Sequence, residues 1–241
     1  MKIASVFLTV DGEVTLGGPW QWTVFVRTGG CNLRCWKSSG FCDAPHTLEM
    51  NGPYEDISVR EVISRCFNLG NVKRCTITGG EPLLQMYDVK SLSRALTVYN
   101  WLVTIETSGS ILFDRQHDLG YIDSVILDMK PPSTEMAKMN KYELLERLGS
   151  RDYVKFVLEN RADYDWAIKI VDEHPTAAQV AFGVRWGYLE LRQVLDWLRA
   201  DERWDIQGNV QSHKYIWEGS HPVPTDSLKT VNFEEMVARE H

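Results

Sequence analysis

The sequence predicts an α/β fold in which crossover helices connect the strands of a parallel sheet. Short apolar runs typical of strands occur at 22–27, 75–78, 102–105, 124–127, 153–158, 180–182 and 206–210. Between these runs, apolar residues recur near helical spacing at 57–69, 89–99, 141–148, 162–173 and 188–200. Alternation of strand and helix along one chain is typical of a parallel sheet with crossover helices.

The order of the elements along the chain predicts a single domain. The first strand run, 22–27, leads directly into a loop that holds three cysteines. In the helical segment that follows, the apolar positions are Val59, Val62, Ile63, Cys66 and Phe67. The same alternation continues to 210 without an internal repeat, a low-complexity tract or a linker. We therefore expect one domain over 1–241, with an irregular C-terminal extension from about 219, where the periodicity is lost.

Composition restricts the class of protein. The 241 residues are 44% hydrophobic and 24% charged, which is typical of a globular protein with a substantial core. No apolar run approaches the roughly 20 residues that span a bilayer, and the first residues lack the features of a signal peptide. Five cysteines, an odd number, argue against a disulfide scaffold and indicate the reducing cytoplasm. A net charge of −7 argues against binding to nucleic-acid phosphates, so we expect neither a nucleic-acid nor a membrane partner.

Three of the five cysteines, Cys31, Cys35 and Cys42, lie close together in one loop. Iron favours thiolate ligands, and three of them would leave one iron of a four-iron cluster open to a small molecule. A zinc site and three ordinary thiols are the alternatives at this point. Cys66 and Cys75 lie in a helical and a strand pattern, so they are expected to be core thiols.

Polar residues and glycines follow five of the predicted strands where each strand ends. These segments are 27–30, 78–82, 106–109, 128–132 and 211–214. Ligands of parallel α/β proteins bind at the carboxyl ends of the strands. Each segment alone could be a turn, but together with the cysteine loop they predict a binding site. Gly79 and Gly80 would let the backbone approach a ligand closely.

A set of motifs extends this pattern across roughly residues 7–217. Cys31-x3-Cys35, an aromatic residue before Cys42, and Gly79-Gly80-Glu81 resemble the radical S-adenosylmethionine superfamily. Further motifs are Asp11-Gly12-Glu13 (usually Gln-Gly-Glu in the family), Phe25-Val26-Arg27, His46-Thr47, and the segments 105–109 and 210–215. Together and in this order, the motifs resemble the 7-carboxy-7-deazaguanine synthase family within that superfamily.

The resemblance implies a fold, cofactors and a reaction. The fold would be a partial (β/α)6 radical-SAM barrel with reduced or variable helices. The cofactors would be a 4Fe–4S cluster on the three loop cysteines and S-adenosylmethionine on the open iron. The reaction would convert 6-carboxy-5,6,7,8-tetrahydropterin to 7-carboxy-7-deazaguanine with loss of ammonia, a lyase step towards queuosine and related 7-deazapurines. Besides the pterin substrate, the implied partners are an electron donor such as flavodoxin and a second copy of the chain in a homodimer.

The resemblance also implies roles for individual residues. The implied metal ligands are Cys31, Cys35 and Cys42, and the implied catalytic residues are Glu106 and His213. S-adenosylmethionine would contact Phe41, Cys42, Asp43, Gly79, Gly80, Glu81, Ser108, Asp128, Met129 and Lys130. The substrate would contact Val10, Asp11, Gly12, Glu13, Arg27, Thr78 and His213. Arg27 suits the substrate carboxylate because its planar guanidinium can bind such a group with two hydrogen bonds.

Besides Asp11, the sequence departs from the family pattern in four places. The spacing between Cys35 and Cys42 is four residues wider than usual. Ala44 stands where many relatives have a threonine that binds magnesium, so magnesium is only a possible cofactor here. The segment 183–185 replaces the usual Gln-Pro, and the chain continues to His241, where relatives end sooner.

Two other functions are compatible with parts of the pattern. One is another small radical enzyme, such as an activase that makes a glycyl radical on a partner protein. The Asp11-Gly12-Glu13 motif, Arg27 and His213 argue against it, because they suit a small carboxylated heterocycle. The other is a zinc- or cluster-bearing module without catalysis, which the metal content would reveal.

Overall fold

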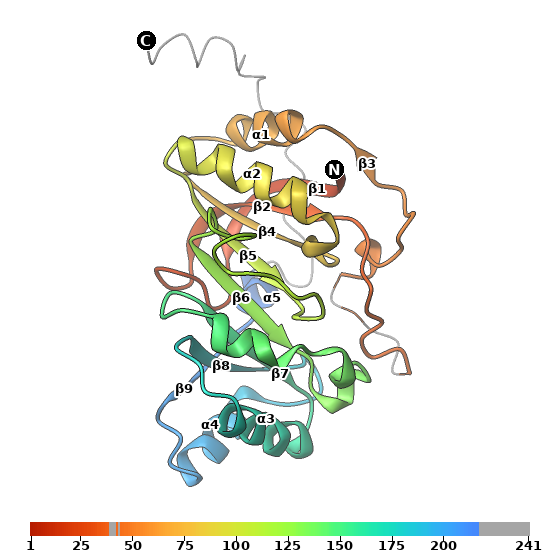
Figure 1. The fold of residues 1–241 in the computed structure, drawn as a ribbon. Coiled ribbons are helices and arrows are strands. Elements are labelled where there is room, and N and C mark those ends of the chain that lie inside the picture. Colours follow the sequence, from red (N-terminus) through yellow and green to blue (C-terminus); the bar gives the residue numbers. More distant parts are fainter. Residues whose placement is uncertain (39–41, 43, 217–241) are drawn as a thin grey trace.

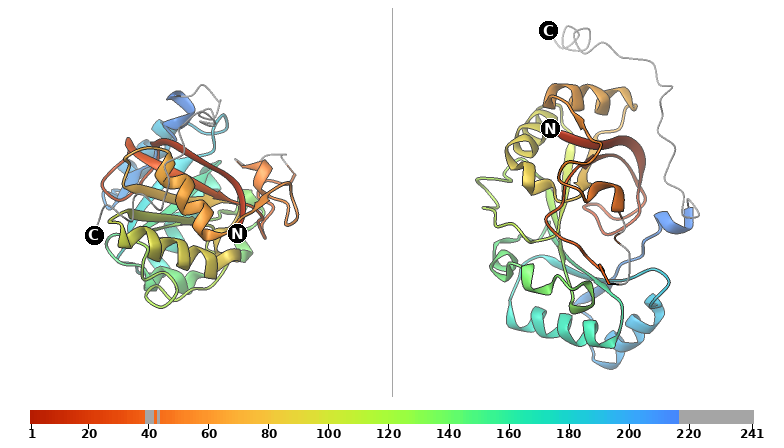
Figure 2. Two further views of the ribbon diagram at one scale, coloured as in Figure 1. Left: turned by 90° about the horizontal axis from the view of Figure 1, so that it is seen from above. Right: turned by 90° about the vertical axis from the view of Figure 1, so that its right-hand side faces the viewer.

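The computed structural model describes residues 1–38, 42 and 44–216. Their strands form one sheet in the order β3-β1-β2-β4-β5-β6-β7-β8-β9. The strands are β1 Lys2–Asp11, β2 Gln21–Thr28, β3 Glu55–Asp56, β4 Arg74–Gly79, β5 Leu102–Thr107, β6 Ser124–Met129, β7 Tyr153–Leu158, β8 Gln179–Val184 and β9 Ile206–Gly208. From β2 to β9 every neighbouring pair is parallel, whereas β1 pairs antiparallel with both β2 and β3. The curved sheet stays open between its edge strands β3 and β9, which confirms the expected partial barrel (Figures 1 and 2).

The helices are unevenly distributed along the sheet. They are α1 Val59–Asn68, α2 Met86–Val98, α3 Arg161–Glu173, α4 Leu191–Ala200 and the short α5 His213–Ile216. The first two lie near β1 to β5, and α3 and α4 lie near β7 to β9 (Figure 1). Residues 108–123, between β5 and β6, form only turns and bends. The expected reduction of some helices is therefore confirmed.

Two elements of the structure differ from the sequence expectations. The helix predicted over 141–148 is a 3-10 helix, Tyr142–Arg147, one of five short 3-10 segments; the others are Pro45–Thr47, Pro82–Gln85, Pro132–Thr134 and Ala137–Met139. Strand β1 was not predicted, although it pairs with β2 over most of its length and extends the sheet beyond the parallel strands. The predicted C-terminal extension from about 219 lies outside the described residues.

Alternation along the strands separates an apolar face from a polar one. On the outer face, residues such as Val26, Ile77 and Leu127 are fully buried and form one core with the apolar sides of α1 to α4. Cys66 and Cys75 belong to this core, and the neighbouring Cys66 and burial raise the pKa of Cys75, as expected for core thiols. The opposite, inner face carries the polar strand residues. The fold therefore places several of the predicted site residues, such as Arg27, Glu106 and Asp128, on the inside of the open barrel.

No helix within the described part of the chain has both the length and the apolar character needed to cross a membrane.

Candidate active site

The cysteine loop begins at the end of β2 and is held there by backbone hydrogen bonds. The Gly30 N–H donates to the Thr47 carbonyl (2.9 Å), and the Cys31 N–H donates to the Leu48 carbonyl (3.1 Å). These bonds place the two arms of the loop side by side. The loop therefore folds back over the carboxyl end of β2, where parallel α/β proteins bind ligands.

Gly79 and Gly80 are needed for contact with this loop. A Cβ on Gly79 would lie 2.3 Å from the Thr28 carbonyl oxygen, and one on Gly80 would lie 2.1 Å from the Gly30 carbonyl oxygen. The Gly80 N–H donates to Thr28 (3.1 Å), and the Glu81 N–H donates to Gly30 (2.8 Å). The two glycines thus allow close backbone packing between the end of β4 and the cysteine loop. The close approach of a ligand to them, expected from the sequence, stays a prediction.

Glu81 ties the end of β4 to the end of β5. Its carboxylate is fully buried and accepts hydrogen bonds from the Leu83 N–H, the Thr107 hydroxyl, and both the N–H and the hydroxyl of Ser108. The Ser108 hydroxyl also lies 2.8 Å from that of Ser110. Four donors can satisfy a buried carboxylate without an ion pair. Glu81 and Ser108, both predicted cofactor contacts, therefore belong to the frame that aligns the strand ends.

The three loop thiols share one electrostatic neighbourhood. Burial raises the pKa of Cys31, and it raises that of Cys35 to about 11. The positive charge of Lys130 opposes both shifts, whereas the neighbouring Cys42 adds to them. None of the three cysteines forms a disulfide, and thiols that influence one another beside a lysine cation fit an anionic iron–sulfur cluster.

The thiols would still have to move together to bind a metal. Within 1–38, 42 and 44–216, no three Cys, His, Asp or Glu side chains are arranged to hold a metal ion. Phe41 and Asp43, which flank Cys42 and were predicted to contact the cofactor, lie outside the described residues.

A chain of buried charges crosses the inner face from the end of β1 to the end of β6. Lys155 Nζ lies 3.0 Å from Glu13 Oε2 and 3.6 Å from Asp128 Oδ2, and Lys130 Nζ lies 3.1 Å from the same Asp128 oxygen. Burial opposes the charge of both lysines, but the nearby carboxylates outweigh it and raise both pKa values. Both lysines therefore stay charged inside the barrel. Asp128 Oδ1 is buried and has no hydrogen-bond partner among the described residues, so it can accept a hydrogen bond from a hydroxyl group of a ligand.

The segments at the end of β1 and after β9 lie together, as the predicted substrate site requires. The Glu13 carboxylate accepts hydrogen bonds from the side-chain amides of Asn209 (2.8 Å) and Gln211 (3.1 Å). The Gly12 carbonyl accepts two hydrogen bonds from Ser212, one from its N–H and one from its hydroxyl. Val10 precedes this segment at the end of β1. His213 begins α5 immediately beyond it, but its side chain lies outside what the structure describes.

Two further carboxyl groups, Asp11 and Glu106, lie beside this charge chain. The Thr76 hydroxyl donates to Asp11 (3.1 Å), and the Thr78 hydroxyl donates to Glu106 (2.7 Å). Burial, followed by the charge of Glu106, raises the pKa of Asp11 to about 7. The inner face therefore holds one carboxyl group that exchanges a proton near neutral pH beside a second whose orientation Thr78 sets.

Arg27 lies on the same inner face of the sheet. It pairs with Thr78 in the register of β2 and β4. Its guanidinium lies 5.1 Å from the centre of the Phe7 ring. Burial lowers the pKa of His46, and the charge of Arg27 lowers it further, so His46 lies nearby. The cation is thus held between the strands at the edge where the cysteine loop begins.

Sequence and structure differ on two residues of the site. The side chain of Met129, a predicted cofactor contact, is fully buried in the outer core, so it faces away from the polar inner face. Lys155, which was not predicted, joins Glu13, a predicted substrate contact, to Asp128, a predicted cofactor contact. A single lysine inside the buried strand Tyr153–Leu158 was the available signal, because a buried lysine almost always has a partner.

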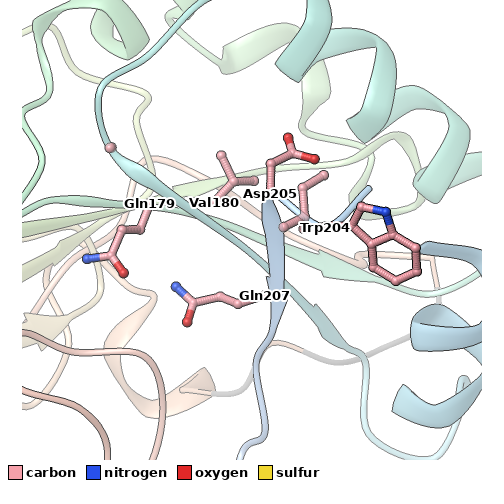
Figure 3. Close-up of a pocket in the computed structure, with 7 residues that line it drawn as sticks. Gln179, Val180, Trp204, Asp205 and Gln207 are labelled. Carbon is pink, nitrogen blue, oxygen red and sulfur yellow. The ribbon is translucent and has the colours of Figure 1, made fainter. Parts of the chain in front are cut away.

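A surface pocket of about 410 Å³ lies elsewhere, between the starts of β8 and β9. Figure 3 shows Gln179, Trp204 and Gln207 around it. These residues are at the amino ends of the parallel strands, whereas the predicted site residues are at the carboxyl ends. The pocket is therefore separate from the candidate site.

Comparisons with known proteins agree with one another. The family model of the radical SAM superfamily matches residues 25–171. The 7-carboxy-7-deazaguanine synthase of Methanospirillum hungatei is 34% identical over 90% of this chain and 85% of its own length. That of Clostridium acetobutylicum is 29% identical over 90% of this chain and 96% of its own length. The crystal structure of QueE from Escherichia coli has the same fold, with a TM-score of 0.65, 16% identity and coverage of 86% of this chain and 92% of that one.

Proposed function

This chain belongs to the 7-carboxy-7-deazaguanine synthase family of the radical SAM superfamily, and from that premise we propose that it converts 6-carboxy-5,6,7,8-tetrahydropterin to 7-carboxy-7-deazaguanine with loss of ammonia. Membership of the superfamily implies a 4Fe–4S cluster and S-adenosylmethionine as cofactors. The observation that carries the proposal is the ion-paired chain Glu13–Lys155–Asp128. It joins the proposed pterin-binding segment to the proposed cofactor-binding segment.

Cys31, Cys35 and Cys42 would hold the cluster. When bound, the cluster and S-adenosylmethionine supply the one-electron chemistry that generates a 5′-deoxyadenosyl radical. Asp128 is the proposed acceptor for a ribose hydroxyl, because its Oδ1 is buried without a partner in the described part of the chain. Lys130 would compensate the negative charge of the thiolates and of a cofactor carboxylate. The electron is proposed to come from a small redox protein such as flavodoxin.

The inner face supplies groups suited to a carboxylated pterin. Arg27 is proposed to bind the substrate carboxylate, since its guanidinium can donate two parallel hydrogen bonds. Glu13 is proposed to accept hydrogen bonds from N–H groups of the heterocycle, in an orientation set by Lys155, Asn209 and Gln211. A buried site of this kind excludes water from the reacting atoms.

Loss of ammonia requires that protons be held near the reacting ring. Glu106 is proposed to handle one proton, because the Thr78 hydroxyl fixes its Oε2 at 2.7 Å. Asp11 provides a second proton site beside it, with a pKa of about 7. His213 is proposed as a further catalytic residue that contacts the substrate.

Magnesium is a separate proposal. Ala44 has no side-chain oxygen, and its carbonyl already accepts hydrogen bonds from the Thr47 N–H (3.0 Å) and hydroxyl (2.8 Å). A magnesium ion here would depend on oxygens of the substrate and of water. We expect such an ion to bind more weakly than in relatives that carry a threonine at this position.

Anaerobic incubation with S-adenosylmethionine, dithionite and the carboxytetrahydropterin tests the proposed reaction. Mass spectrometry should detect 7-carboxy-7-deazaguanine and 5′-deoxyadenosine. Cys42→Ala should abolish both products and lower the iron content, whereas the matched Cys66→Ala, in the outer core, should change neither. Cleavage of the cofactor without conversion of the pterin would favour the activase alternative. A colourless protein that contains zinc would favour the non-catalytic module.

A further inference from the structure

Two departures from the family pattern meet in this structure. Trp36 is the first residue of the widened spacing between Cys35 and Cys42, and Arg185 lies in the segment that replaces the usual Gln-Pro. The guanidinium carbon of Arg185 is 4.7 Å from the centre of the Trp36 ring. We propose that Arg185 is a positioning residue that holds Trp36, and through it Cys35, where the cluster binds.

Arg185 is rigidly placed at the end of β8. Its N–H donates to the Leu158 carbonyl (2.7 Å), and its Nη1 lies 2.6 Å from Glu159 Oε2, so the last residue of β7 holds its backbone and the residue after β7 holds its side chain. The guanidinium is also 3.9 Å from the centre of the Tyr188 ring. Arg185 is only 4% exposed. A buried cation with a carboxylate partner and aromatic neighbours keeps one orientation, and it can therefore act as a fixed support.

Trp36 needs such a support. Its φ of +53° is in the left-handed region, which bulky side chains rarely adopt and which persists only where the surroundings maintain it. The residue is 5% exposed, and its N–H donates to the Thr134 carbonyl (3.0 Å). Because Trp36 directly follows Cys35, the contacts that fix its ring also fix the direction in which the Cys35 thiol leaves the backbone. The structure thus anchors Trp36, at the start of the longer loop, to Arg185 at the end of β8.

This inference rests on the proposed function, since it assumes that the loop cysteines hold a cluster. The test measures how fast the reconstituted protein loses iron to an excess of the chelator bathophenanthroline, without oxygen or substrate. The variants are Arg185→Met, Arg185→Lys, Trp36→Leu, and the double variant Trp36→Leu with Arg185→Met. Arg203→Met is the matched control, because Arg203 is also ion-paired and little exposed but lies near the start of β9.

We expect Arg185→Met and Trp36→Leu each to lose iron roughly tenfold faster than the unmodified protein, as loss of a desolvated cation–aromatic contact predicts. The double variant should be no faster than either single variant, because both remove the same contact. The rate of iron loss from Arg185→Lys should lie between those of the unmodified protein and Arg185→Met, since lysine keeps the charge but lacks the planar group. The melting temperatures of the iron-free Arg185 and Trp36 variants should shift no more than that of iron-free Arg203→Met. This comparison separates an effect on cluster positioning from an effect on general stability.

Three results would overturn the inference. They are iron loss no faster than in Arg203→Met, additive effects in the double variant, and melting shifts that account for the faster loss. If Arg185→Met does not fold, Arg185→Lys and Trp36→Leu decide, and rates equal to that of the unmodified protein refute the positioning role. An unmodified protein that takes up no cluster would refute the proposed cofactor together with this inference. Slow iron loss from the unmodified protein, with equally slow loss from these variants, would refute only the positioning role.

Discussion

Replacement of Lys155 by methionine tests the charge pairing at the centre of the inner face. The lysine side chain is 7% exposed, and its Nζ lies 3.0 Å from Glu13 and 3.6 Å from Asp128. Methionine fills much of the volume of the lysine stem but neutralises neither carboxylate. The variant therefore leaves two buried negative charges with fewer partners.

The size of the effect follows from the partners that remain. Removal of one member of a buried ion pair costs about 3–5 kcal/mol, because the other charge stays buried. Glu13 keeps its hydrogen bonds from Asn209 and Gln211, and Asp128 keeps Lys130, so we expect a loss near the lower limit, about 3 kcal/mol. The pKa of Lys155 is raised well above its usual value, so its contribution is complete below its unfolded-state pKa and disappears only as pH rises through the folded-state pKa. The loss should therefore be constant between about pH 6 and about pH 9.

Urea unfolding of the iron-free protein, followed by tryptophan fluorescence, measures this loss. Addition of Glu13→Gln to the Lys155→Met variant should restore a large part of the stability, because it removes one uncompensated charge. Lys169→Met is the control: Lys169 is 67% exposed and pairs with Glu173 at 3.7 Å, so we expect less than about 0.5 kcal/mol. A loss in Lys155→Met no larger than in Lys169→Met would refute the reasoning. So would a further loss of stability on adding Glu13→Gln.

Three other variants test the remaining roles. Because burial and Glu106 raise the pKa of Asp11 to about 7, stability should fall as pH rises from about 4 to about 7, by at most about 4 kcal/mol for about three pKa units. Asp11→Asn should remove this slope in urea titrations, and an unchanged slope would contradict the assignment. Arg27→Lys should weaken substrate binding roughly ten- to a hundredfold while uncoupled 5′-deoxyadenosine formation persists, because the second charge-assisted hydrogen bond is lost; equal losses in both assays would show that Arg27 supports the fold. Ala44→Thr should strengthen the magnesium dependence of turnover, and a steep, saturable requirement in the unmodified enzyme would contradict the prediction.

The local pattern of apolar residues was sufficient to predict most of the parallel strands. The buried run Tyr153–Leu158 matches β7 at both ends, because a short apolar segment between polar residues has few alternatives. The segment 141–148 was less certain to form an α-helix, because its leucines are spaced three and four residues apart and suit either helix type. In the structure its leucines are buried in the outer core, and the segment forms a 3-10 helix, Tyr142–Arg147. Strand β1 acquires its role from its pairing with β2, a partner that its own residues do not specify.

The sequence by itself determined which residues could carry the chemistry: the three loop cysteines, the polar strand ends and Arg27. Only the tertiary structure decided which of them act on one another. It placed the Met129 side chain in the outer core and hydrogen-bonded Glu81 to Ser108. It also placed Lys155 between Glu13 and Asp128. The physical reason is that strand period reveals the face on which a side chain lies, whereas its neighbours depend on strands and loops distant in the sequence.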